Sequence, residues 1–114
     1  YPAERISPLP ASWQKKYFKK FEENKVKVVD KIRQEIIFRR FNLMEKVYPF
    51  KQKFQVIFCR NVMIYFDLPT KNKLIKKLYE QLQPGGYLFV GHAEALNRET
   101  TDFRYVRPAI YRKI

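Results

Sequence analysis

The chain has 114 residues, 46% of them hydrophobic and 17% aromatic, which is enough for one small packed core and too much for a disordered tail. The single cysteine, Cys59, excludes an internal disulfide and favours a reducing, cytoplasmic location. A membrane-spanning helix needs roughly 20 apolar residues and no such run exists, nor is a signal peptide visible. The first residue is Tyr1 rather than Met, so we expect the chain to belong to a longer protein.

The charge is strongly positive. Lys and Arg number 24 against 11 Asp and Glu, a formal net charge of +13. This balance predicts a polyanionic partner, which is an acidic protein surface, a nucleic acid or an anionic membrane surface. Solvated helix faces explain the same pattern equally well, because the cations fall into separate groups along the chain. These groups are Lys15, Lys16, Lys19 and Lys20; Lys71, Lys73, Lys76 and Lys77; and Arg104, Arg107, Arg112 and Lys113.

Residues 1–24 are predicted to form a lead-in segment and a helix. Three prolines in residues 1–10 indicate an extended start. Ser12 is expected to cap a helix that begins near Trp13 and ends at Glu22-Glu23-Asn24. Its aromatic face consists of Trp13, Tyr17, Phe18 and Phe21.

Residues 25–41 are predicted to form a small antiparallel β subdomain. Lys25–Val29 alternates basic and β-branched residues, and Glu35–Phe41 is rich in Ile and Phe. We expect these two stretches to pair with each other.

Residues 42–114 carry the pattern of a βαβ unit. The apolar run Phe54–Cys59 has the length of a central strand buried on both faces. A helix with one apolar stripe and a second apolar strand follow, so the sequence predicts an α/β fold with a parallel sheet and a closing pair of short strands. The expected elements are a helix start at Asp67-Leu68-Pro69-Thr70, a helix over Lys71–Leu82, a turn at Pro84-Gly85-Gly86, a strand at Tyr87–Val90, and strands at Phe103–Arg107 and Ala109–Lys113.

The carboxyl ends of the two parallel strands are the predicted site. Ligands of open α/β sheets bind beyond such ends, which makes Arg60 and Asn61, together with His92 and Glu94, candidate site residues. Polar residues there also serve simply to satisfy backbone groups where a sheet ends. Cys59 is expected to be a buried, inert thiol. The three glycines, at 85, 86 and 91, form no phosphate-binding loop, and no metal-ligand spacing exists.

Two segments carry a resemblance to a known family. Cys59-Arg60-Asn61-Val62-Met63-Ile64-Tyr65-Phe66 and the later Gly91-His92-Ala93-Glu94 closely resemble the CheR-type chemotaxis receptor methyltransferases, which methylate protein glutamates. Asn42-Leu43 matches the family's Asn-Leu segment before this strand. Gln55 and Ala93 depart from the pattern, since Asp and Ser are usual there.

The resemblance implies the C-terminal half of a Rossmann-like class I methyltransferase domain that uses S-adenosyl-L-methionine (SAM) and no metal, with residues 25–41 as the remnant of a small β subdomain. It further implies that Asn42 and Leu43 lie beside the adenine-ribose end of the cofactor, that Arg60 and Asn61 line its pocket, and that Tyr65 faces the methyl-transfer cleft. The substrates would be glutamates on the acidic methylation helices of chemoreceptors, and a basic protein would be steered to them.

The glycine-containing loop and the acidic ribose-binding residue of the family do not occur in these residues. We therefore expect the chain alone to bind SAM weakly, to be inactive, and to dimerise through an open sheet edge. Three alternatives remain: a basic nucleic-acid-binding module, a non-catalytic methyltransferase-like scaffold, and a SAM-dependent methyltransferase of RNA or DNA.

Overall fold

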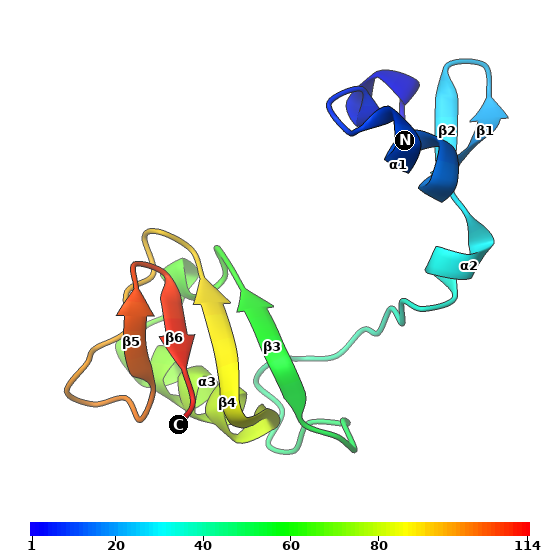
Figure 1. Cartoon of the computed structure of the whole chain (residues 1–114). Helices are drawn as coiled ribbons and strands as arrows, with labels where there is room; N and C mark the ends of the chain where they lie inside the picture. Colours follow the sequence, from blue (N-terminus) through cyan, green and yellow to red (C-terminus); the bar gives the residue numbers. More distant parts are fainter. The chain divides into compact units, whose positions relative to one another are not determined.

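The computed structural model describes residues 1–114, which form two compact units, residues 1–40 (unit 1) and residues 41–114 (unit 2) (Figure 1). Each unit has its own secondary structure and is described by itself. The longest helix has 14 residues, and no helix combines the length and hydropathy needed to cross a bilayer.

Unit 1 is built around a short antiparallel hairpin. Its strands β1 (Phe18–Glu22) and β2 (Lys25–Val28) pair with Phe18 opposite Val28. Asn24 closes the turn with a φ of 61°, a left-handed conformation that Asn tolerates better than most residues. Before and after the hairpin lie the short helices η1 (Ala3–Ile6), α1 (Ala11–Tyr17) and α2 (Asp30–Arg33).

Several sequence predictions for unit 1 are wrong. The lead-in segment contains the helical turn η1, and α1 begins after Pro10, with no side-chain cap from Ser12. The helix stops at Tyr17, because Phe18 and the residues after it pair with β2. Residues 35–41 form no strand, so Lys25–Val28 has a different partner from the one expected. The connection at Glu23-Asn24 is short, and closing it costs less chain entropy than reaching residues 35–41.

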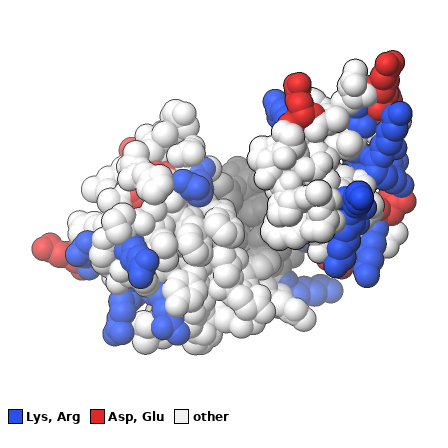
Figure 2. All heavy atoms as spheres, turned by 45° about the horizontal axis from the view of Figure 1, so that its top comes forward, with Lys and Arg blue, Asp and Glu red and all other residues white.

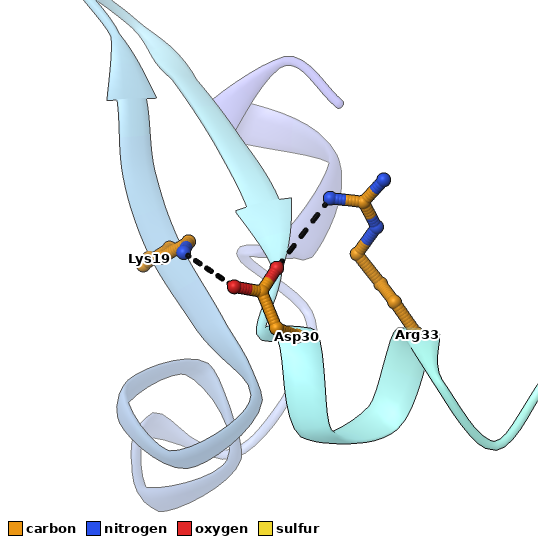
Figure 3. A network of polar contacts seen from close by, with 3 residues as sticks. All are labelled: Lys19, Asp30 and Arg33. Atoms are coloured by element: carbon orange, nitrogen blue, oxygen red, sulfur yellow. Dashed lines mark ion pairs between the residues drawn. The ribbon is translucent and has the colours of Figure 1, made fainter.

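Unit 1 carries many cations on its surface, seen at the right of Figure 2. Asp30 is one of the exposed acidic residues among them. The carboxylate of Asp30 is 3.6 Å from Lys19 Nζ on β1 and 3.6 Å from Arg33 Nη1 on α2 (Figure 3). All three side chains are exposed, so these ion pairs contribute little to the stability of unit 1.

Unit 2 is a four-stranded sheet with one long helix on one face (Figure 1). The strands run in the order β3-β4-β6-β5, where β3 (Phe54–Cys59) and β4 (Leu82–Val90) are parallel and β6 (Ile110–Arg112) pairs antiparallel with β4 and with β5 (Arg104–Arg107). Helix α3 (Leu68–Gln81) joins β3 to β4. The predicted βαβ unit and closing strand pair are thus confirmed.

Helix α3 begins where the sequence predicts. The Asp67 carboxylate accepts a hydrogen bond from the Thr70 amide at 3.0 Å and caps the first turn. The apolar stripe of α3 is buried against the sheet and makes the centre of the core. The core side chains include Met63, Leu74, Ile75, Leu78, Leu82, Leu88, Val90, Leu96, Phe103 and Tyr111.

Two details of the sheet differ from expectation. β3 lies at an edge and is not buried on both faces: Phe58 is 70% exposed and stacks on Phe89, at 4.8 Å between ring centroids. The Pro84-Gly85-Gly86 segment lies inside β4 as a bulge, because pairing passes from Phe54–Leu82 directly to Val56–Tyr87. Gly85 has a φ of 84° at this bulge, which favours a residue without a Cβ.

Candidate cofactor site at the ends of the parallel strands

The carboxyl ends of β3 and β4 lie side by side, as the sequence predicts. Cys59 pairs with Val90 at the last register position, so the chain leaves both strands at the same edge of the sheet. Arg60 and Asn61 follow β3, and Gly91 follows β4. After Asn61 the backbone turns into the short helix η2 (Met63–Tyr65).

The buried side chain of Glu94 connects these two strand ends through hydrogen bonds to backbone amides of both. One carboxylate oxygen accepts hydrogen bonds from the amides of Asn61 (2.5 Å) and Gly91 (2.9 Å). The other accepts from the amides of Val62 (3.1 Å), Met63 (2.6 Å) and Ile64 (3.2 Å). The residue is 1% exposed, so it faces the protein interior and not the solvent.

The Glu94 carboxylate is held ionised. Burial by itself raises its pKa, but the amides of Asn61, Gly91, Met63 and Ile64 lower it by more, and the net pKa lies below the ordinary value. A carboxylate with both oxygens engaged in this way does not serve as a proton acceptor.

Asn61 has an unusual backbone at this junction. Its φ of 60° is left-handed, which Asn adopts more readily than other residues with a Cβ. A Cβ added to Gly91 would lie 2.6 Å from Asn61 Oδ1 and 2.6 Å from Glu94 Oε1. The absence of a side chain at Gly91 therefore lets the Asn61 side chain approach the end of β4.

A pocket of about 360 Å³ lies along β3. Arg60 is its only charged lining residue. Its other polar side chains are those of Gln81 on α3, Tyr48 and Cys59. Tyr48 donates a hydrogen bond from its hydroxyl to the Leu43 carbonyl at 2.5 Å, which holds the lining loop. The remaining lining is aliphatic and aromatic: Phe41, Leu43, Phe50, Ile57, Phe58, Val62 and Leu78.

The pocket gathers only part of the predicted site. Leu43 and Arg60 line it, whereas Asn42 and Asn61 lie beside it in the sequence and are exposed. Asn42 uses its side-chain oxygen to accept a hydrogen bond from the Met44 amide at 2.9 Å. Tyr65, at the end of η2, is 81% exposed.

His92, a candidate site residue, and Cys59, expected to be inert, have different surroundings. His92 is exposed and lines a different, smaller pocket of about 200 Å³ with Tyr105 and Ala109. Cys59 is buried, and its pKa is raised by burial and by the negative charge of Glu94, as expected for an inert thiol. The sequence placed Glu94 at a strand end near the site but did not reveal its contacts. The sequence pattern of an acidic residue at a strand end is the same whether its carboxylate faces solvent or binds backbone amides.

Comparisons with known proteins identify the family. A family model described as "CheR methyltransferase, SAM binding domain" matches residues 1–111. The chain is 40% identical over 113 residues to a chemotaxis protein methyltransferase of Borreliella burgdorferi, covering 99% of this chain and 40% of the relative. It is 37% identical over 114 residues to chemotaxis protein methyltransferase 2 of Pseudomonas aeruginosa, covering 97% of this chain and 41% of that protein.

The chain thus spans about two fifths of the length of these relatives. The matched domain is described by its ability to bind SAM, which makes SAM the cofactor that the family implies for this sheet. Both the extent of the match and its level of identity lead to one conclusion: this chain belongs to the CheR methyltransferase family, as part of its SAM-binding domain.

Proposed function

We propose that the chain is the C-terminal part of the catalytic domain of a SAM-dependent protein-glutamate O-methyltransferase that modifies the cytoplasmic helices of chemoreceptors. The observation that carries the proposal is the family match over residues 1–111, in which the Cys59–Phe66 segment follows a parallel strand at a sheet edge suited to a ligand. Within this proposal, residues 1–40 form a lead-in unit with a small antiparallel hairpin at Phe18–Val28, and residues 41–114 form half of the cofactor domain.

The pocket along β3 fits one end of SAM. Its volume of about 360 Å³ is within the range of small-ligand pockets, and its aromatic and aliphatic lining suits an adenine ring. Leu43 and Arg60 line it, and Asn42 and Asn61 are their neighbours in the sequence. We assign these four residues to cofactor binding, with Leu43 packing on the adenine-ribose end and the Arg60 guanidinium available to an anionic group.

Tyr65 is assigned to the methyl-transfer cleft. When bound, SAM supplies a methyl group activated by attachment to a positively charged sulfur. A glutamate carboxylate of the substrate would receive this methyl group, and S-adenosylhomocysteine would be the second product. Positioning dominates such an in-line displacement, so the exposed Tyr65 side chain is suited to orienting the incoming carboxylate rather than to moving a proton.

The substrate is proposed from charge. Chemoreceptor methylation helices are acidic, and the net charge of +13 favours their association with this protein. Unit 1 contributes a cationic hairpin, with Lys19, Lys20, Lys25 and Lys27 on β1 and β2. This hairpin is expected to accelerate association and to lose that effect at high salt.

The test measures binding and transfer separately. S-adenosylhomocysteine is titrated calorimetrically into residues 1–114 and into the longest natural form of the protein that contains them, and methyl transfer to a glutamate-rich receptor helix is followed with labelled SAM. We expect binding and transfer only in the longer form, a loss of binding on Arg60→Ala, and no loss on Arg107→Ala, an exposed arginine of β5.

Two outcomes would contradict the proposal. Absence of binding in both forms would favour a scaffold without cofactor, and the basic surface would become the main functional feature. Salt-sensitive binding of single-stranded DNA at submicromolar affinity, without binding of S-adenosylhomocysteine, would favour the nucleic-acid-binding alternative.

A further inference from the structure

The side chain of Glu94 has a chemistry that the proposed methyl transfer does not use. It is an ionised group at 1% exposure in a chain with only 11 acidic residues, and its five hydrogen-bond donors are all backbone amides. No lysine or arginine neutralises it among the ion pairs of the structure. Its negative charge is therefore stabilised by oriented peptide dipoles.

The donors come from two separate segments. Four belong to the consecutive residues 61–64, where the chain turns from β3 into η2, and one belongs to Gly91 at the end of β4. Glu94 itself lies three residues after Gly91. The carboxylate thus ties the turn that follows one strand to the end of the neighbouring strand, and Glu94 itself lies 33 residues after Asn61 in the chain.

The turn that Glu94 ties carries residues of the proposed site. Asn61 starts it in a left-handed conformation, and Tyr65 ends it. A left-handed residue with a Cβ costs backbone energy unless the surroundings enforce it. The hydrogen bonds from Asn61 and Met63, the two shortest of the five, supply that enforcement.

We propose that Glu94 is a positioning residue of the cofactor site, whose carboxylate holds the Asn61–Tyr65 turn in the conformation that presents Asn61 to the cofactor and Tyr65 to the substrate. The inference rests on the proposed function, because it takes the roles of Asn61 and Tyr65 from there. Glu94 touches neither cofactor nor substrate, since both oxygens are occupied by backbone donors in the protein interior.

The alternative is that Glu94 only stabilises the fold. A purely structural role would lower the fraction of folded protein and leave each folded molecule with normal affinity. A positioning role would weaken the affinity of folded molecules. Calorimetry with S-adenosylhomocysteine separates the two, because the apparent number of sites reports the competent fraction and the dissociation constant reports affinity.

The main variant is Glu94→Gln in the longest natural form of the protein. The amide keeps the shape but puts an NH₂ group against backbone donors, which releases part of the turn. We expect the dissociation constant for S-adenosylhomocysteine to rise about 10- to 100-fold, the scale found when groups that orient a site are lost. Glu94→Asp retains the charge and should recover part of the affinity. Glu99→Gln, at an exposed acidic residue five positions later, should leave it unchanged.

A readout without cofactor accompanies the titration. In nuclear magnetic resonance spectra, the amide signals of Asn61, Met63 and Gly91 should move and exchange faster with solvent in Glu94→Gln, while those of the β5–β6 pair stay in place. If Glu94→Gln does not fold, Gly91→Ala replaces it, because the added Cβ would lie 2.6 Å from Asn61 Oδ1 and Glu94 Oε1 and disturb the same junction with the charge retained.

A variant at Asn61 separates this inference from the proposed function. Asn61→Gly keeps the left-handed turn and removes only the side chain. If Asn61→Gly binds as tightly as wild type, the proposed role of Asn61 is wrong. If Asn61→Gly binds weakly while folded Glu94→Gln or Gly91→Ala binds with wild-type affinity, the positioning role of Glu94 is refuted and the proposed function survives.

Discussion

Lys113 provides a sharp test of how unit 2 is held together. Its side chain is only 9% exposed, and its Nζ donates hydrogen bonds to the carbonyls of Tyr79 and Leu82, both at 2.9 Å. These carbonyls lie at the C-terminal end of α3, where the helix dipole favours a cation. The same Nζ is 4.6 Å from the centroid of the Tyr79 ring. Lys113 therefore ties the end of the last strand to the end of the only long helix.

The contribution of Lys113 to stability is the balance between its hydrogen bonds and the cost of burying its charge. Hydrogen bonds that involve a charged group contribute about 1.5–3 kcal/mol each. Burial opposes them, since it lowers the pKa of Lys113, and the positive charge of Lys53 lowers it further. The Tyr79 carbonyl keeps a second donor, the Leu82 amide, when the lysine is removed. We therefore expect Lys113→Met, which keeps the apolar stem, to reduce the free energy of unfolding by about 2 kcal/mol.

Urea denaturation of the longest natural form of the protein, followed by far-ultraviolet circular dichroism, measures this loss. Lys76→Met is the matched control, because Lys76 is on α3 and exposed.

The pH dependence gives a second readout. The pKa of Lys113 is lower in the folded protein, so the unfolded chain binds the lysine proton more tightly. The protein therefore becomes more stable as the pH rises through the folded pKa of Lys113 toward its ordinary value of 10.5. Lys113→Met should remove that rise. A stability equal to that of Lys76→Met, or higher than wild type, would show that the cost of burial cancels the hydrogen bonds and would refute the reasoning.

Three further predictions concern single side chains. The hydrogen bonds from Thr70 lower the pKa of Asp67, so Asp67 stabilises the protein above its ordinary pKa of 3.8 and loses that contribution as the pH falls through the folded pKa. Asp67→Ala should lower the urea midpoint at pH 7. Asp67→Asn should keep the midpoint at pH 7 but lack the acid-dependent loss of stability. Cys59 should react with Ellman's reagent at pH 8 far more slowly in the folded than in the unfolded protein, and equal rates would contradict its burial. Residues 1–114 should associate through the open edge of β3, and Phe58→Lys should shift sedimentation toward the monomer; an unchanged profile would place the contact elsewhere.

The sequence by itself determined the elements whose signals are local. Asp67, Pro69 and the apolar stripe of the following residues define where α3 begins and which face it buries, because capping and a 3.6-residue period need no distant partner. The alternation of an apolar run, a helix and a second run was enough to predict the parallel pair β3–β4. The Cys59–Phe66 segment was enough to indicate the family that the comparisons then identified.

Tertiary structure decided the features that depend on a partner far away in the chain. Lys25–Val28 had strand character, but pairing chose β1 over residues 35–41, since a tight hairpin closes at a lower entropic cost. Phe54–Cys59 looked central, yet the exposure of Phe58 depends on which strands flank it. In the sequence, Glu94 was a candidate site residue and Lys113 one of a group of surface cations. Both are buried, because backbone amides and carbonyls from remote segments converge on them. Charge burial is a property of the surroundings, and only the folded chain brings those surroundings together.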